Sequence, residues 1–295
     1  MEGFREKLAR RQKRTNSLVC VGLDPVFEKK PACASSITDW MCRIVDETAE
    51  NASMFKPNVA HWESIPCGVG IAGLKTVIYY IHNKFPDIPV FLDCKRGDIA
   101  RTQEQYRKAC FDVIGADGMN FSPYMGRDCM AALVDKENLG RALVGLCYTS
   151  NFDARDIQDL LIGGSAHPMK LWEYVAYSTL RWAEELGVTE NAGLVMAAAY
   201  ENPKGSGKIY SEHLTRCRNI VGNSLWFLIP GIGTQGGYIA ETVKAAYRGP
   251  GSIAINSSSE IVFASSGEDY AQAAGQKTRE LRDKINAALE ESKKG

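Results

Sequence analysis

Hydrophobic and polar residues alternate along the chain in a regular rhythm of short and long segments. Short apolar runs rich in β-branched residues are typical of strands, and the longer stretches between them have the periodicity of helices. The predicted strands span residues 18–23, 54–57, 90–94, 118–121, 142–148, 193–197, 226–229 and 252–256. The predicted helices span residues 37–50, 73–83, 101–114, 169–186, 237–247 and 270–292.

This alternation predicts a (β/α)8 TIM barrel that forms a single domain over residues 1–295. Strands that read as almost continuous apolar runs are expected when a parallel sheet is buried on both faces. An open doubly wound sheet is the alternative fold. It is disfavoured because no G-x-G-x-x-G motif follows the first strand, where Gly22-Leu23-Asp24-Pro25 stands instead.

The two ends of the chain and two polar loops complete this picture. The basic segment 1–14 is predicted to be a helix on the surface of the fold. The last segment, 270–292, is predicted to be an amphipathic helix, with Ala274, Leu281, Ile285 and Leu289 on its apolar face. Segments 163–168 and 201–208 contain Gly, Pro and Ser and are predicted to be flexible loops.

Composition narrows the class of protein. Lys and Arg together number 35, as do Asp and Glu, and this balance excludes a globally basic nucleic-acid binder. No apolar run approaches the ~18–20 residues needed to cross a membrane, so neither nucleic acid nor membrane is an expected partner. None of the nine cysteines forms a C-x-x-C motif, and several lie in apolar runs. We therefore expect buried thiols in a reducing, cytoplasmic compartment, although an organelle address on a missing fusion partner would be invisible here.

Charged residues gather where the first three predicted strands end. Asp24 and Lys56 end the first two strands, and Asp93 and Lys95 end the third, with Asp98 on the following loop. Catalytic groups of a barrel come from these carboxyl ends, and residues i and i+2 of a strand face the same side. We therefore predict a charge cluster that holds a protonated lysine beside a reacting carbon. A purely structural salt bridge is the alternative.

A second candidate site lies after the last two strands. The glycine-rich segment 230–237 follows the seventh predicted strand, and the serine-rich segment 256–259 lies at the end of the eighth predicted strand. Glycines let backbone N–H groups approach a ligand, and barrels often bind phosphate with these two loops. The pattern predicts a phosphate site. The alternative is that the glycines only form a tight turn.

Taken in order, these motifs resemble the orotidine 5′-phosphate decarboxylase family, in its longer, bacterial-type branch, over residues 18–264. The resemblance implies decarboxylation of orotidine 5′-monophosphate (OMP) to UMP in pyrimidine biosynthesis, with no cofactor and no metal. The motifs that carry it are Asp93-x-Lys95-x-x-Asp98-Ile99-x-x-Thr102, Phe55-Lys56-Pro57-Asn58, Val21-Gly22-Leu23-Asp24-Pro25, Thr149-Ser150-Asn151 and the glycine-rich segment.

The resemblance also implies roles for individual residues. Lys95 would donate a proton to C6 of the pyrimidine, and Asp93 would hold Lys95 beside the leaving carboxylate. Asp98, Ile99 and Thr102 would reach into the neighbouring subunit's site, so a homodimer with shared active sites is expected. The other implied substrate-binding residues are Asp24 and Lys56 at the ribose, Ser150 at the pyrimidine, and Pro230, Gly233, Gln235, Ser258 and Ser259 in the last two loops.

Two departures from the family pattern leave alternatives open. Ser259 stands where the family usually has a phosphate-binding Arg, and Phe152-Asp153 stands where it commonly has Pro-Gly. Either another cation, such as Lys204, Lys208 or Arg248, replaces the guanidinium, or the Arg aligns a few residues away, or the protein is a weak or altered member of the family.

Three other functions are weighed against the decarboxylase. The first is a barrel that binds nucleotides with weak or lost catalysis. The second is a Mg²⁺-dependent sugar-phosphate decarboxylase or aldolase, and the third is an aldolase that forms a Schiff base on Lys95. The family's decarboxylase also occurs fused to the orotate phosphoribosyltransferase that makes its substrate, so the chain is either a separate protein or one domain of a fusion.

Overall fold

Eight parallel strands form the centre of the molecule. The computed structural model describes residues 2–163, 168–232 and 238–293. The strands run side by side in the order β2-β1-β12-β11-β8-β5-β4-β3, and bridges from Phe55 to Val90 and from Asn58 to Asp93 join β2 to β3. This ring confirms the predicted TIM barrel. The strands are β1 Val19–Gly22, β2 Met54–Lys56, β3 Phe91–Arg96, β4 Gly118–Phe121, β5 Ala142–Tyr148, β8 Ala192–Met196, β11 Trp226–Ile229 and β12 Ile253–Ser257.

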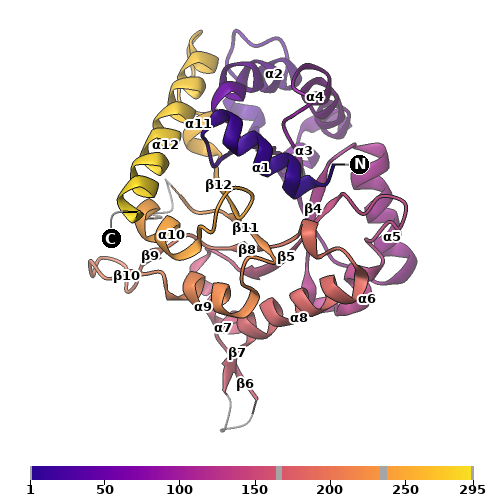
Figure 1. Cartoon of the computed structure of the whole chain (residues 1–295). Coiled ribbons are helices and arrows are strands. Elements are labelled where there is room, and N and C mark those ends of the chain that lie inside the picture. Colours follow the sequence, from indigo (N-terminus) through magenta and orange to yellow (C-terminus); the bar gives the residue numbers. More distant parts are fainter. Residues whose placement is uncertain (1, 164–167, 233–237, 294–295) are drawn as a thin grey trace.

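Helices surround this ring and bury the outer faces of the strands (Figure 1). The predicted closing helix is confirmed as α12, which packs against α2 and α10 and buries Ala274, Leu281 and Ile285. The outer helices are α2 Ile37–Thr48, α3 Val59–Glu63, α4 Gly70–Lys84, α5 Ala100–Lys108, α6 Arg127–Ala131, α7 Arg155–Gln158, α8 Leu171–Leu186, α9 Glu212–Val221, α10 Ile239–Ala246, α11 Ser259–Val262 and α12 Tyr270–Ser292.

The N-terminal helix α1 (Phe4–Thr15) lies across the amino-terminal end of the barrel (Figure 1). The Phe4 ring stacks on Trp226 with 5.4 Å between centroids and meets Phe91 edge-on at 6.1 Å. Leu8 is fully buried in the same cluster, which fills the inside of the barrel. The prediction of a surface helix was therefore incomplete, because the apolar pair Phe4 and Leu8, one turn apart, closes one end of the barrel.

Two segments predicted as flexible loops belong to β-hairpins. Strands β9 (Tyr200–Glu201) and β10 (Ile209–Tyr210) pair antiparallel around the segment 202–208, and Glu201 accepts hydrogen bonds from backbone N–H groups of this turn. Strands β6 (Leu161–Ile162) and β7 (Met169–Lys170) form the hairpin that projects from the body of the molecule in Figure 1. Of the predicted loop 163–168, residues 164–167 lie outside the described residues.

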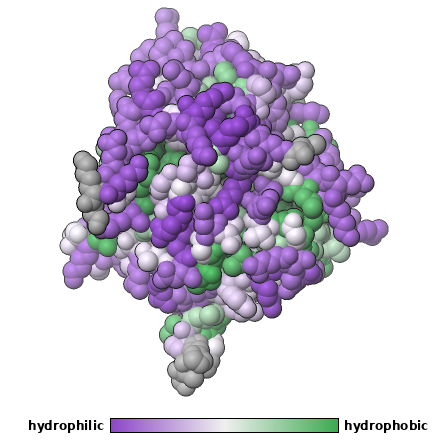
Figure 2. Space-filling view, viewed as in Figure 1, coloured by the Kyte–Doolittle hydropathy of each residue, from purple (hydrophilic) through white to green (hydrophobic). Residues whose placement is uncertain are grey.

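The hydrophilic surface and the free cysteines match what the composition led us to expect. The face shown in Figure 2 is covered mainly by hydrophilic residues. All nine cysteines are free thiols, and the six that are buried are Cys20, Cys94, Cys110, Cys129, Cys147 and Cys217. Within the described part of the chain, every helix is too short or too polar to cross a bilayer.

Candidate active site

A cavity of about 480 Å³ opens at the carboxyl ends of the barrel strands. It brings together eight of the residues that the sequence indicated. These are Asp24, Lys56, Asp93, Lys95, Ser150, Pro230, Ser258 and Ser259. They come from the ends of β1, β2, β3, β5, β11 and β12. The carboxyl-end rule of barrels therefore located most of the site without any contact information.

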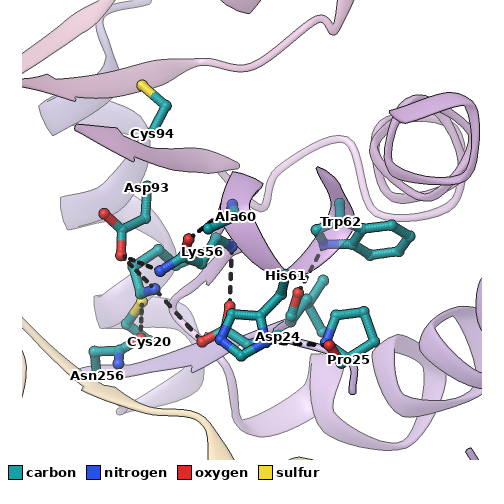
Figure 3. A network of polar contacts seen from close by, with 12 residues as sticks. Cys20, Asp24, Pro25, Lys56, Ala60, His61, Trp62, Asp93, Cys94 and Asn256 are labelled. Atoms are coloured by element: carbon teal, nitrogen blue, oxygen red, sulfur yellow. Dashed lines mark hydrogen bonds and ion pairs between the residues drawn. The ribbon is translucent and has the colours of Figure 1, made fainter. Parts of the chain in front are cut away.

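The buried ammonium of Lys56 lies between two carboxylates (Figure 3). Its Nζ is 3.1 Å from Asp93 Oδ2 and 3.9 Å from Asp24 Oδ2. Asp24 is itself held by the backbone N–H of Asn58, which donates to its Oδ1 at 2.9 Å. The strands place these groups because β1 pairs in parallel with β2, with Gly22 opposite Lys56, so that Asp24 lies just beyond this register.

Burial and charge act in opposite directions on this cluster. Burial alone lowers the pKa of Lys56, but Asp24 and Asp93 outweigh it and raise that pKa above the ordinary lysine value. Burial alone raises the pKa of Asp93, but Lys56 and Lys95 outweigh it and hold that pKa below the usual range of an aspartate. Both Lys56 and Asp93 are therefore ionised at neutral pH, as paired opposite charges require.

Lys95 presents its ammonium to the cavity from the end of β3. Its Nζ is 2.7 Å from Asp93 Oδ1, and its side chain is 51% exposed. Asp93 therefore binds one lysine on each oxygen. Each oxygen also accepts from an asparagine, Asn120 at 2.6 Å on Oδ1 and Asn58 at 3.2 Å on Oδ2. The i, i+2 spacing correctly predicted that Asp93 and Lys95 meet, whereas Cys94 between them points to the opposite side of the strand (Figure 3).

The opposite wall of the cavity is formed by the ends of β11 and β12. It contributes Pro230, Gly231 and Ile232 from one strand end and the serines at 257–259 from the other. Gly22 at the end of β1 makes room for this wall, because a Cβ there would lie 2.5 Å from the Cβ of Ser258. Among the described residues that line the cavity, the cations are Lys56 and Lys95, so this wall has small polar groups in place of a charge.

Three residues that the sequence indicated lie outside the lining of this cavity, and two others are not described. Asp98, Ile99 and Thr102 lie outside its lining, and the side chain of Ile99 is 51% exposed. Asp98 accepts from the backbone N–H of Ile99 at 2.8 Å. Gly233 and Gln235 lie outside the described residues.

The three cations considered as replacements for the missing Arg lie in two different places. Lys204 and Lys208 are exposed in the turn between β9 and β10, which follows a barrel strand on the cavity side. Arg248 follows α10, and its backbone N–H donates to Ser252 Oγ at the start of β12. It therefore lies at the amino-terminal end of the barrel, away from the cavity, and this position disfavours Arg248 among the three candidate cations.

Sequence reasoning missed Asn120 and an apolar group in the cavity, and it named Asn58 and Asn256 only as parts of longer motifs. Asn58 and Asn120 hold Asp93, and Asn256 accepts from Cys20 Sγ at 3.5 Å. Asn120 and Asn256 interrupt apolar strand sequences, and such a polar residue in a buried run was the available signal. The apolar lining comes from Leu146, Val195 and Leu228 on β5, β8 and β11.

The loop after β5 is fixed by hydrogen bonds within itself. Gln158 Oε1 accepts from Thr149 N at 2.9 Å, and its Nε2 donates to Thr149 Oγ1 at 2.8 Å. Thr149 Oγ1 in turn donates to Asn151 Oδ1 at 2.8 Å. Ser150 is thereby held at the rim of the cavity between two anchored neighbours.

Comparisons with known proteins agree with this geometry. The family model described as "Orotidine 5'-phosphate decarboxylase / HUMPS family" matches residues 17–274. The chain is 37% identical to the orotidine 5'-phosphate decarboxylase of Variovorax paradoxus, over 97% of this chain and 98% of the relative. It is 38% identical to that of Cupriavidus necator, over 96% and 97%.

Two solved structures from Leishmania donovani share the fold. The OMP decarboxylase has a TM-score of 0.76 and 33% identity, with 97% of this chain and 98% of that chain covered. The UMP synthase has a TM-score of 0.78 and 33% identity, with 98% of this chain but 57% of that chain covered. The family match, the decarboxylase relatives and the cavity of charged strand ends together show that the chain belongs to the orotidine 5′-phosphate decarboxylase family.

Proposed function

We propose that Lys95 is the proton donor in the decarboxylation of OMP to UMP by this chain. The observation that carries the proposal is the 2.7 Å contact between Lys95 and Asp93 inside a cavity of the family's barrel. The bond between C6 and the substrate carboxylate breaks, CO₂ leaves, and the electron pair stays on C6. An N–H proton of the Lys95 ammonium then passes to C6, and water restores the proton to the amine.

The charge cluster supplies the electrostatic part of this reaction. A carbanion that develops at C6 is stabilised by an ammonium that is already in place, so little reorganisation is needed as the charge forms. Asp93, which is held ionised by Lys56, fixes the position of that ammonium. Its negative charge beside the substrate carboxylate also disfavours the ground state more than the transition state, in which that charge has moved away.

The shape of the cavity suggests how the nucleotide lies across it. Strands β3 and β11 stand on opposite sides of the ring, four positions apart in the order of strands. We assign the pyrimidine to the side of Lys95 and Ser150, the ribose hydroxyls to Asp24 and Lys56, and the phosphate to the wall of Ser258 and Ser259. Pro230 also lines that wall, and Gly233 and Gln235 stay predictions for the phosphate.

We also propose that the active form is a homodimer with shared sites. Asp98, Ile99 and Thr102 follow the catalytic strand directly, yet they lie outside the cavity of their own subunit. The exposed side chains of Ile99 and Thr102 are suited to contact a second copy, and Asp98 would then complete the charge cluster there. This chain covers 57% of the structural neighbour named UMP synthase. Fusion to orotate phosphoribosyltransferase therefore stays a prediction for this chain.

One feature disfavours the sugar-phosphate alternative that uses Mg²⁺. The ammonium of Lys56 occupies the space between the carboxylates of Asp24 and Asp93, where a divalent cation would need those oxygens. The proposal therefore assigns the positive charge of the site to lysines and needs no cofactor.

The loss of OMP ultraviolet absorbance in EDTA, measured with purified protein, tests this function. Saturable turnover to UMP is the expected result. OMP or UMP binding without turnover would support the nucleotide-binding alternative. Neither binding nor turnover would contradict the substrate assignment, and sugar phosphates with Mg²⁺ would then be tested.

A further inference from the structure

The end of β3 departs from regular pairing at the point where the catalytic residues stand. Leu92 pairs with Met119 of β4, but the next paired residues are Arg96 and Phe121. Strand β3 therefore advances four residues while β4 advances two. The additional residues form a bulge that contains Asp93 and Lys95, and Lys95 adopts a left-handed backbone with φ of +47°. Bulges of this kind redirect side chains next to active sites.

The side chain of Asn120 fills the gap that the bulge leaves in the β3–β4 pairing. Its Oδ1 accepts from the backbone N–H of Cys94 at 2.9 Å and from that of Lys95 at 2.6 Å. Its Nδ2 donates to Asp93 Oδ1 at 2.6 Å. Asn120 is 1% exposed, so water cannot replace these bonds readily. One amide therefore holds both the backbone of Lys95 and the carboxylate of Asp93.

The second asparagine on Asp93 does not have this double role. Asn58 donates to Asp93 Oδ2 at the longer distance of 3.2 Å, and its own Oδ1 accepts from Ala60 N at the start of α3. It therefore ties Asp93 to the neighbouring helix. The contact to the Lys95 backbone belongs to Asn120.

We propose that Asn120 is a positioning residue that pins the β3 bulge and so fixes the Lys95 ammonium and the Asp93 carboxylate relative to each other. The inference rests on the proposed roles of Lys95 and Asp93. The left-handed backbone of Lys95 is unfavourable for a residue with a Cβ. Without the Asn120 side-chain carbonyl, the buried N–H of Cys94 and the partly buried N–H of Lys95 would lose their partner. Loss of Asn120 therefore releases the bulge and displaces the ammonium.

Two variants and one control test this proposal. Asn120→Ala removes all three hydrogen bonds, and kcat should fall about 100-fold, the usual effect of misplacing a reacting group by ~1 Å. KM should stay within about threefold, because the nucleotide is held elsewhere in the cavity. The control is Asn191→Ala, which removes a buried asparagine that binds Arg5 N and Leu139 O at the far end of the barrel. That change should lower Tm and leave kcat unchanged.

Asn120→Asp is nearly isosteric and gives a readout that a merely structural role would not produce. When the new carboxyl group is ionised, it repels the Asp93 carboxylate. When it is protonated, its O–H donates to Asp93 while its carbonyl oxygen still accepts from the backbone. The ratio of its kcat to that of the wild type should therefore rise at least about tenfold between pH 8 and pH 5. The charged groups that face Asn120 are Asp93 and Lys95, and Lys56 and Asp24 lie behind Asp93. The Cys94 thiol donates to the backbone carbonyl oxygen of Asn120 at 3.4 Å.

The outcomes separate this inference from the function on which it rests. If Lys95→Ala still turns over OMP, the proposed role of Lys95 is wrong. If Lys95→Ala is inactive but Asn120→Ala keeps kcat within about threefold of the wild type, only the role of Asn120 is contradicted. A kcat ratio for Asn120→Asp that does not change with pH also contradicts the role of Asn120. If Asn120→Ala does not fold, the pH dependence of Asn120→Asp is the deciding test.

Discussion

The two walls of the cavity differ in charge. The wall formed by β1, β2 and β3 carries Asp24, Lys56, Asp93 and Lys95, joined by ion pairs of 2.7–3.9 Å. The wall formed by β11 and β12 carries Pro230 and a run of serines, and among the described lining residues it has no cation. The first wall is built before the substrate arrives. The second offers only short neutral donors to an anion.

We expect the charged wall to serve the chemical step and the neutral wall to serve substrate binding. A preorganised charge acts on the reacting carbon, because its position costs nothing at the moment of reaction. A neutral wall contributes to affinity, and its remote contacts are useful only as far as they hold the substrate against the charged wall. Changes in the first wall should therefore reduce kcat, and changes in the second should mainly change KM.

The largest effect is expected from Asp93→Ala. The change leaves the buried Lys56 ammonium with Asp24 at 3.9 Å as its remaining carboxylate, and breaking a buried pair in this way typically costs about 3–5 kcal/mol. Turnover should fall below detection, and denaturant unfolding should show the lost stability. The matched control is Asp46→Ala, which removes a partly exposed pair with Lys84 and the hydrogen bond from Tyr80 Oη, and should lower the free energy of unfolding by about 1–2 kcal/mol without loss of turnover. A fully stable, active Asp93→Ala would contradict the account of the charged wall.

The next prediction concerns the completion of this wall by a second subunit. Lys95→Ala and Asp98→Ala should each be inactive, whereas a mixture that exchanges subunits should regain activity. In a random mixture, half of the dimers are mixed and each of these has one intact site, so about a quarter of the wild-type activity is expected. Activity should appear only after subunit exchange. A mixture that stays inactive, despite mixed dimers seen by native mass spectrometry, would place Asp98 in its own subunit's site or outside any site.

An acid-sensitive group lies where α9 packs against the end of β8. His213 is fully buried, its Nε2 donates to the backbone carbonyl oxygen of Ala197 at 2.8 Å, and burial lowers its pKa to about 4. The unfolded chain binds the proton near pH 6.5, so stability should be lost as the pH falls from 6.5 towards 4, by about 3 kcal/mol at most. Asp93 and Lys56 stay paired throughout this range, because the pKa of Asp93 lies below it. His213→Gln should flatten the dependence of Tm on pH, and an unchanged slope would contradict the assignment.

The smallest effects are expected at the neutral wall. Ser259→Ala removes a single hydroxyl and should raise KM about tenfold or less, with kcat nearly unchanged. Ser259→Arg restores a charged, bidentate donor and should lower KM by about tenfold. Lys204→Ala and Lys208→Ala, measured in parallel, show whether the turn between β9 and β10 supplies the missing charge. A Ser259→Arg protein with unchanged KM would mean that the phosphate lies elsewhere.

Much of the fold and of the charged wall could be predicted from the sequence. The strands could be located because each is a short apolar run between helical stretches, and a barrel brings the ends of such strands to one rim. Asp93 and Lys95 could be paired because side chains two residues apart share a side of a strand. No three-dimensional information was needed for either step.

Other features depend on contacts that the sequence does not encode locally. Helix α1 closes the amino-terminal end of the barrel through Phe4 and Leu8, although the helix is otherwise rich in Arg and Lys. Asn120 holds a bulge in the neighbouring strand, and the bulge is visible only in the pairing register. The position of Arg248 followed from the strand that comes after it, which sequence reasoning did not use.

The most direct test of the account is the kcat of Lys95→Ala at saturating OMP, measured in EDTA alongside UMP binding and Tm. We predict no detectable turnover by a protein that is folded and still binds UMP, because the charged wall then lacks the group that stabilises and protonates C6. Turnover within about tenfold of the wild type by this variant would contradict the assignment of Lys95 as the proton donor.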